Sequence, residues 1–416
     1  MAVMLPIKHN QSSMFRMPKE LKNGISAIIT ELKKENKNRL AGCISENWNK
    51  TCLQYSKELF EWEPEHPMEP EMKAAMESEI SRVGLSEEAP KIVSFLSKHR
   101  VLQTAPHLVL TLNPRMLCIE WLGSLGVPDQ GYYVSATFSG IPFSNSFRPG
   151  RVNRKTGSVN LLPSSMQDAL VYRSRIPDKL PGMLSSLPEP IAKMLDAPHP
   201  GDSFTRWALK AGRKIEGKIF GRRNIILVDI NEITAEYLKL VLGKKNHPVR
   251  EVFFNPVVRR EFVKIFPNEI MFYSPAKKGK YDSMENLRMK DLESDLDSSG
   301  PEGLKKKIEK ENLCPGLLLV FIATAFLNGF KCYGSFSQVE YLPEYQKKLG
   351  KMEIFKPYGI EKVPTANLTT GVFPGTKEWP ADIIIEGKEI NPDPEMLFGE
   401  LLAGMKDTLS AGRKNK

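Results

Sequence analysis

Polar side chains that could do chemistry stand beside several of the apolar runs in this 416-residue sequence. Asp229 lies near the end of the run IILVDI, and His107 stands in TAPH, just before another apolar run. An imidazole titrates near neutral pH, so we predict that His107 is catalytic, as a general base, an oxyanion donor or a phosphate ligand. We also predict a catalytic role for Asp229, with a ribose or an amine as its partner. A structural, hydrogen-bonded role stays open for both residues.

A second group of polar residues is predicted to bind the ligand. In parallel sheets, ligands lie beyond the carboxyl ends of the strands, and these residues occupy such positions. Asn113 precedes a predicted helix whose free N–H groups suit a phosphate or a carboxylate. Every parallel sheet has polar residues in its turns, so a purely structural role is the alternative. The predicted ligand-binding residues are Asn113, Arg115, Ser139, Asn145, Arg148, Asn231 and Gln338.

The motifs of several common enzyme classes do not occur. The sequence has no GxSxG, no GxxxxGK[ST] and no GxGxxG, which argues against P-loop enzymes and common dinucleotide enzymes. The five cysteines form no CxxC pair, and no two histidines stand four residues apart, so no metal site is predicted. The cofactor is therefore unknown, with a bound nucleotide left open.

Basic residues exceed acidic ones, 59 to 49, which gives a net charge of +10. The strongest contribution comes from the segment 201–223, where basic residues recur at helical spacing between Arg206 and Arg223. Such a face could bind nucleic acid or an acidic partner, or it could simply be solvated. Only Trp207 and Phe220 supply aromatic rings there, so single-stranded nucleic acid is not specifically indicated.

The elements that would position these residues are predicted to alternate between strands and helices. Each strand reads as a continuous apolar run, which favours a parallel sheet covered on both faces. We therefore predict an α/β fold with a mostly parallel, Rossmann-like sheet. The predicted strands are 108–112, 132–138, 225–230 and the run near Cys332, and the predicted helices are 115–125, 232–242 and 317–327.

The chain is predicted to have three parts. Residues 1–105 read as a helical N-terminal region, 106–349 as the α/β core, and 350–416 as a wrapping segment. Within the core, 277–312 is polar with little apolar periodicity, so we predict a mobile insertion or lid. The last part is predicted to carry a strand at 383–385 and a helix at 395–409.

The longest apolar run, 317–327, is too short for the roughly 20 residues of a membrane span and is predicted to be a core helix. Residues 1–19 lack the pattern of a signal peptide. No membrane partner and a cytoplasmic location are therefore expected.

Three stretches resemble the bacillithiol synthase family, the enzymes thought to add cysteine to a glucosaminyl-malate. They are LQTAPH (102–107) followed by Asn113-Pro114, the strand, polar loop and strand of 132–163, and GSFSQ (334–338) with Tyr341. The resemblance covers about a third of the chain and implies a nucleotidyltransferase-like Rossmann core with added helices. The family's acidic, histidine-bearing loop is replaced here by 139–145, so no catalytic residue or substrate is carried over.

These observations predict an enzyme, a transferase or ligase of small-molecule biosynthesis. It would transfer or condense a small anionic metabolite that bears a carboxylate or a phosphate. The alternative is a non-catalytic, basic protein that binds nucleic acid or supports assembly through the 206–223 face.

Overall fold

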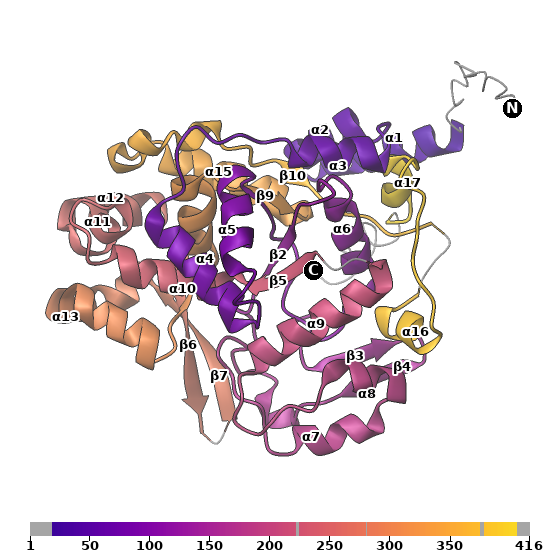
Figure 1. The fold of residues 1–416 in the computed structure, drawn as a ribbon. Coiled ribbons are helices and arrows are strands. Elements are labelled where there is room, and N and C mark those ends of the chain that lie inside the picture. Colours follow the sequence, from indigo (N-terminus) through magenta and orange to yellow (C-terminus); the bar gives the residue numbers. More distant parts are fainter. Residues whose placement is uncertain (1–18, 222–223, 280, 375–377, 406–416) are drawn as a thin grey trace, which may run out of the picture.

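A five-stranded parallel sheet lies at the centre of the computed structural model, which describes residues 19–221, 224–279, 281–374 and 378–405 (Figure 1). Numbered by their order along the chain, the strands run third, second, first, fourth and fifth across the sheet, and every neighbouring pair is parallel. The strand order therefore reverses between β1 and β9. From one edge to the other the strands are β5 (Ile225–Asp229), β2 (Tyr133–Thr137), β1 (Val101–Gln103), β9 (Lys331–Gly334) and β10 (Asn367–Leu368).

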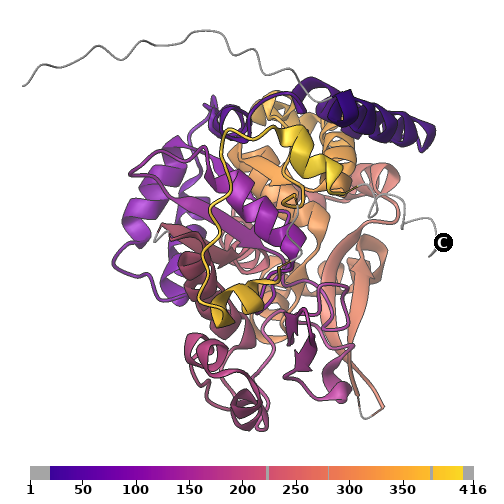
Figure 2. The same cartoon turned by 90° about the vertical axis from the view of Figure 1, so that its right-hand side faces the viewer.

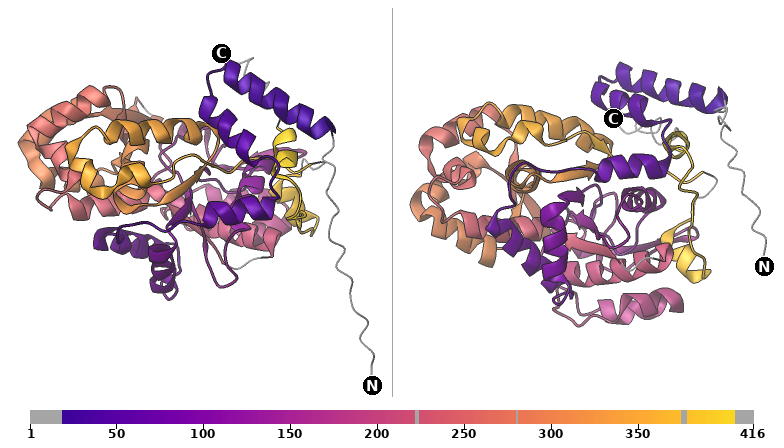
Figure 3. Two further views of the ribbon diagram at one scale, coloured as in Figure 1. Left: turned by 90° about the horizontal axis from the view of Figure 1, so that it is seen from above. Right: turned by 45° about the horizontal axis from the view of Figure 1, so that its top comes forward.

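Both faces of this sheet are buried, which explains the continuous apolar runs of its strands. In β5, Ile226 and Val228 face one hydrophobic cluster while Ile225 and Leu227 face the other. The first cluster includes α4 (Pro70–Arg82), α5 (Ala89–Lys98) and α10 (Ile230–Val241), and the second includes α6 (Pro114–Ser124) and α9 (Phe204–Phe220) (Figures 1 and 3). The predicted α/β class with a parallel sheet is confirmed.

The N-terminal helices follow the predicted pattern. Amphipathic spacing places Ile25, Ile28 and Leu32 on the buried face of the first helix, and Pro70 begins the fourth. The prediction missed the short β1, which lies inside the region expected to be helical. The N-terminal helices before α4 are α1 (Lys19–Lys34), α2 (Asn38–Asn47) and α3 (Cys52–Phe60).

The segment 108–112 is not a strand, although its apolar residues alternate. Leu108, Leu110 and Leu112 are buried, but the backbone makes only an isolated bridge there, between His107 and Phe138. The first strand of the sheet is β1, earlier in the chain, which pairs with β2 and β9. This shift places His107 beyond the carboxyl end of β1 instead of at the entrance of a strand.

Residues 277–312, predicted as a mobile polar insertion or lid, form regular structure. β6 (Ile270–Lys278) and β7 (Tyr281–Arg288) form a hairpin, and β8 (Cys314–Pro315) pairs with β6 (Figure 2). The helix α13 (Met289–Lys310) follows, with a kink at Gly300, whose φ of +61° is readily adopted only by glycine. Five apolar side chains on its inner face are buried: Met289, Leu292, Leu296, Leu304 and Ile308.

The C-terminal predictions were partly wrong. Residues 383–385 belong to the helix α16 (Pro380–Ile385), and the last helix, α17 (Phe398–Ala403), is shorter than predicted. Residues 406–409 of the predicted helix lie outside the described residues. The remaining elements are β3 (Arg151–Arg154), β4 (Gly157–Asn160), α7 (Leu180–Met183), α8 (Glu189–Leu195), α11 (Pro248–Phe254), α12 (Pro256–Ile265), α14 (Leu317–Phe321), α15 (Phe336–Leu349) and five short 3-10 or π turns.

The apolar run 317–327 is helical, as predicted. It forms α14 and a π turn at Ile322–Phe326, and its side chains from Leu318 to Leu327 are buried in the core. Among the described residues, no helix has the length and apolar character needed to cross a membrane.

Candidate functional site

Three of the predicted residues meet at the carboxyl ends of β2 and β5. The Ser139 hydroxyl donates to Oδ2 of Asp229 at 2.6 Å, and the N–H groups of Ser139 and Gly140 donate to Oδ1 of Asn231 at 2.9 and 3.1 Å. Oδ1 of Asp229 accepts from the first N–H groups of α10, as a helix N-cap does. Asp229 is only 1 % exposed. Its contacts therefore hold the loop and the helix in place, and its carboxylate is buried among them.

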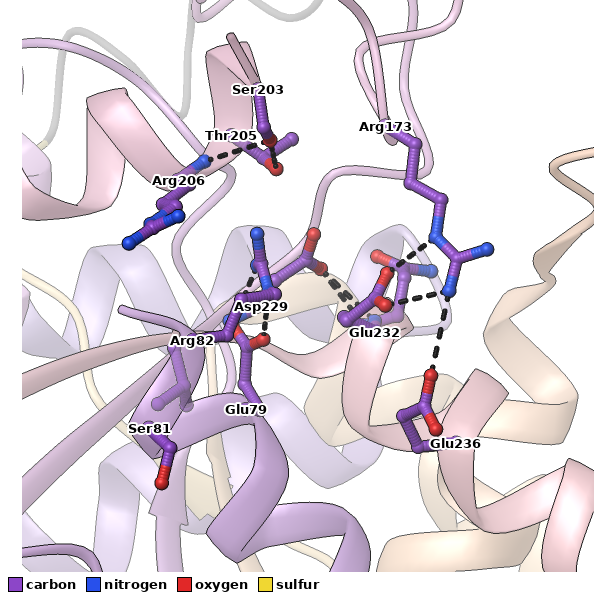
Figure 4. A network of polar contacts seen from close by, with 12 residues as sticks. Glu79, Ser81, Arg82, Arg173, Ser203, Thr205, Arg206, Asp229, Glu232 and Glu236 are labelled. Carbon is purple, nitrogen blue, oxygen red and sulfur yellow. Dashed lines mark hydrogen bonds and ion pairs between the residues drawn. The ribbon is translucent and has the colours of Figure 1, made fainter. Parts of the chain in front are cut away.

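A belt of charged side chains surrounds this contact (Figure 4). The backbone N–H of Asp229 donates to Glu79, whose carboxylate is paired with Arg82 on the next turn of α4. On the other side, Arg173 pairs with Glu232 at 2.6 Å. None of Glu79, Arg82 and Arg173 was predicted, because nothing local in the sequence shows that α4 and the loop after β4 approach β5.

Burial sets the protonation of this belt. Removal from water raises the pKa of Asp229 to about 6 and that of Glu79 to about 7, because the charged form of a carboxyl loses its hydration. Burial opposes the ionisation of Glu232 too, but its hydrogen bonds to Arg173 outweigh that effect and hold its pKa below the ordinary value. Glu232 therefore loses its proton at a lower pH than Asp229 and Glu79 do.

His107 and Asn145 form a second contact at the same edge of the sheet. Nδ1 of His107 lies 3.2 Å from Oδ1 of Asn145, and this oxygen also accepts the N–H of Phe147 at 3.1 Å. An amide oxygen cannot donate, so Nδ1 must carry the proton and Nε2 must present its lone pair. Burial lowers the pKa of His107, against the smaller opposing effect of this hydrogen bond. The imidazole is therefore neutral near pH 7 and chemically suited to accept a proton.

A polar cavity of about 160 Å³ opens beside Asn145. Its wall includes Arg148 and Arg151, and neither guanidinium makes an ion pair with any described residue. The backbone N–H of Arg148 donates to the carbonyl of Asn145, so the cavity and the His107 contact share one loop. The other lining residues are Phe143, Ser144, Gly150, Asn160, Leu162, Pro163 and Gln167.

Arg148 adopts a φ of +52°, which costs an L-residue about 1 to 2 kcal/mol relative to the right-handed region. Conformations of this kind persist where the surroundings enforce them, and they cluster at functional sites. Arg148 was predicted as a ligand-binding residue. Arg151 was not among the predicted ligand-binding residues, because the sequence does not show that its side chain shares a cavity with Arg148.

The remaining predicted residues lie where the strand order reverses, between β1 and β9. Gln338 on α15 exchanges hydrogen bonds with Thr104 after β1, at 2.9 and 3.1 Å. Asn113 accepts the N–H of Met116 and caps α6. Arg115 lies with its guanidinium carbon 5.0 Å from the centre of the Phe336 ring, and its Nε is buried without a hydrogen-bond partner among the described residues. The predicted set thus falls into three neighbouring groups along one edge.

A pair of buried carboxyls on the α6 and α9 side of the sheet also escaped prediction. Oε1 of Glu120 accepts the Ser135 hydroxyl at 2.7 Å, while Oε2 of Glu120 and Oε2 of Glu216 have no hydrogen-bond partner in the described part of the chain. Burial raises the pKa of Glu120 to about 7, and burial together with the charge of Glu120 raises that of Glu216. Both carboxyls lie in the core, away from the polar cavity.

The basic segment forms the outer face of α9. Arg206, Lys214 and Lys218 are exposed, and Lys214 pairs with Asp196. Arg222 and Arg223 lie outside the described residues. Among the described residues, no group of three or more His, Cys, Asp or Glu side chains is arranged to hold a metal ion.

In comparisons with known proteins, no family model, no curated protein and no solved structure matches this chain.

Proposed function

We propose that this protein is an enzyme that transfers or condenses a small anionic metabolite, and that Arg148 and Arg151 hold the metabolite's carboxylate or phosphate. The observation that carries the proposal is the polar cavity with its two unpaired guanidiniums. A guanidinium left without a counter-charge favours binding of an anion, and its planar fork matches the two oxygens of a carboxylate or phosphate.

The size of the cavity suggests which part of the ligand enters it. A volume of about 160 Å³ is small beside the roughly 300–1,000 Å³ of typical ligand pockets, so it suits one anionic group with a few further atoms. The rest of the ligand would lie over the loop at Asn145. This arrangement would bring its reacting atoms toward the neutral His107, whose Nε2 lone pair can remove a proton from an attacking amine or hydroxyl.

The strand order supports a Rossmann-like interpretation of the sheet. The order third, second, first, fourth, fifth is that of dinucleotide-binding sheets, in which ligands bind beyond the carboxyl ends of the strands near the reversal of order. The reversal here lies between β1 and β9, and His107 follows β1. A bound nucleotide fits this interpretation as a second ligand near Arg115 and Phe336.

Thermal denaturation with added anions tests the proposal. Phosphate and small mono- and dicarboxylates would be titrated against the whole protein and its Arg148→Gln and Arg151→Gln variants. A ligand at a hundred times its dissociation constant stabilises by about 2.7 kcal/mol, a readily measured shift. Both variants should lose this shift.

The matched control is Arg206→Gln, which removes an exposed arginine from the α9 face and should keep the shift. A further variant, Arg148→Gly, relieves the positive φ and should leave the unliganded protein at least as stable while abolishing anion binding. Equal stabilisation of the wild type and both glutamine variants by every anion would refute the proposal.

A further inference from the structure

A large groove shares no lining residue with the polar cavity and differs from it in chemistry. Its floor is apolar and its rim is acidic. Its volume is about 1410 Å³, larger than the roughly 1,000 Å³ upper range of small-molecule pockets, so its size suits a peptide segment. It lies where α1 meets α17 and the coil that leads from α16 to α17 (Figure 1). Its apolar lining includes Leu21, Phe373, Ile390, Met396 and Leu397.

The rim has one sign of charge. Six carboxylates line the groove, and no lysine or arginine is among its described lining residues. Five of them, Glu20, Glu389, Asp393, Glu395 and Glu400, make no ion pair with a described residue, and the sixth, Glu378, pairs with Lys388. The protein as a whole carries a charge of +10, so this face is strongly acidic against its surroundings. An occupant should therefore combine apolar side chains with positive charge.

We propose that residues 1–18 of the same chain occupy this groove. Apolar side chains are frequent in this segment between Met1 and Ile7 and again between Met14 and Met17. It contains Lys8 and Arg16 but no aspartate or glutamate, so its charge complements the rim. It joins α1 at Lys19, and the next two residues of α1, Glu20 and Leu21, already line the groove. The connection therefore needs no long linker, since an extended chain spans about 3.3 Å per residue.

The other available segment, 406–416, fits less well. It follows α17 and carries Lys406, Arg413, Lys414 and Lys416, so its charge is also suitable. Leu409 is its only large apolar side chain, which leaves the apolar floor without a matching partner. Burial of apolar surface contributes more to the free energy of binding than charge attraction does. Residues 1–18 therefore match the groove better than residues 406–416.

Limited trypsin digestion of the whole protein tests this proposal, because Lys8 and Arg16 are cleavage sites within the segment. Glu389→Gln/Glu395→Gln neutralises the exposed rim without adding a cleavage site. Cleavage after Lys8 and Arg16, followed by mass spectrometry, should become about tenfold faster in this variant, because protease access follows the population of the released segment. High salt should accelerate the same cleavages in the wild type.

Glu302→Gln/Glu309→Gln, on exposed positions of α13, is the matched control and changes the net charge equally. It should digest like the wild type. A second variant, Met4→Asp/Leu5→Asp, weakens the segment and leaves the groove intact, and it should also speed cleavage after Lys8.

Three results would overturn the proposal. Equal cleavage rates in the wild type and both test variants would show that the groove does not protect the segment. Faster cleavage after Lys406 or Arg413 alone would assign the groove to the other end of the chain. Protection that disappears on dilution would assign it to a second copy of the protein.

Discussion

The hydroxyl of Ser139 and the carboxylate of Asp229 are joined by a hydrogen bond of 2.6 Å that ties the carboxyl ends of β2 and β5 together. The same carboxylate caps α10, so one side chain fixes a loop, a strand end and a helix. Its position between these elements makes Asp229 a residue that shapes the edge of the sheet where the strands end. His107, by contrast, lies next to the loop of the polar cavity.

Replacement of Asp229 should therefore be costly even without ligand. Asp229→Ala removes the cap of α10 and leaves the Ser139 hydroxyl without its buried partner, with an expected loss of about 2 to 4 kcal/mol in the free energy of unfolding. Ser139→Ala should cost about 1 kcal/mol, because the carboxylate keeps its backbone partners. Urea denaturation measures both. A loss below 0.5 kcal/mol for Asp229→Ala would contradict the structural role, in view of the usual cost of losing a cap.

The buried pair Glu120 and Glu216 should make stability depend on pH. Both pKa values are raised, so the folded protein holds protons that the unfolded chain releases. The contribution of Glu120 is complete below about pH 4.5 and is lost as the pH rises through about 7, with each pKa unit worth about 1.4 kcal/mol, and that of Glu216 is lost in the same direction as the pH rises. Urea denaturation between pH 5 and 8 should show this decline, which Glu120→Gln should flatten. A decline of the same steepness in Glu120→Gln would show that other groups cause it.

His107 should act in the opposite direction. Its lowered pKa means that the unfolded chain binds a proton at a higher pH than the folded protein does. Its contribution to stability is therefore present above about pH 6.5 and is lost as the pH falls through the folded value. NMR titration of the imidazole, assigned with His107→Gln, should give a midpoint below 6.5. Asn145→Ala removes a hydrogen bond that raises the pKa, so it should lower the midpoint further; a rise would contradict the contact.

The inner face of α13 should be essential to the core. Leu296 is 3 % exposed, so Leu296→Ala should lower the free energy of unfolding by about 2 to 5 kcal/mol. Ser298→Ala, at an outward position on the same helix, is the control and should cost less than about 0.5 kcal/mol. An equally small effect at Leu296 would mean that this segment does not pack as the structure describes.

Residues 277–312 show why the sequence was misread there. The five buried apolar residues of α13 stand among charged ones, and Gly300 with Pro301 interrupts the helix, so the stripe looks like scattered apolar residues in a polar linker. The segment 108–112 shows the opposite error. Alternating leucines predict a strand. Here the leucines alternate because their side chains are buried in the core, while the backbone forms no ladder with a neighbouring strand. By contrast, β2, β5 and α10 were predictable, because a wholly buried strand followed by a capped helix has a strong local signature.

The candidate site was predictable only in part for a related reason. Residues at strand ends follow from the chain order of the elements, so Ser139, Asp229 and Asn231 could be proposed. His107 was proposed for its imidazole, because β1, the strand that it follows, was not predicted. The partners that decide their chemistry come from distant segments. Glu79 reaches Asp229 from α4, 150 residues earlier in the chain, and Arg173 reaches Glu232 from the loop after β4. No local sequence pattern shows that residues so far apart in the chain lie close together in the fold.

The pairing of 48–53 with 394–399 bears on how the protein is made. Backbone N–H groups of Cys52, Phe398 and Gly399 donate across this contact to Met396, Lys50 and Trp48, and α1 packs against α17. Chains are synthesised at about 5 to 20 residues per second, so α1–α3 wait on the order of tens of seconds for this partner segment. Throughout that interval the apolar face of α1 that packs against α17 lacks its covering surface. The nascent chain should therefore be a substrate for chaperones until α17 has emerged, and its N-terminal helices should be among the last parts to become resistant to protease during translation.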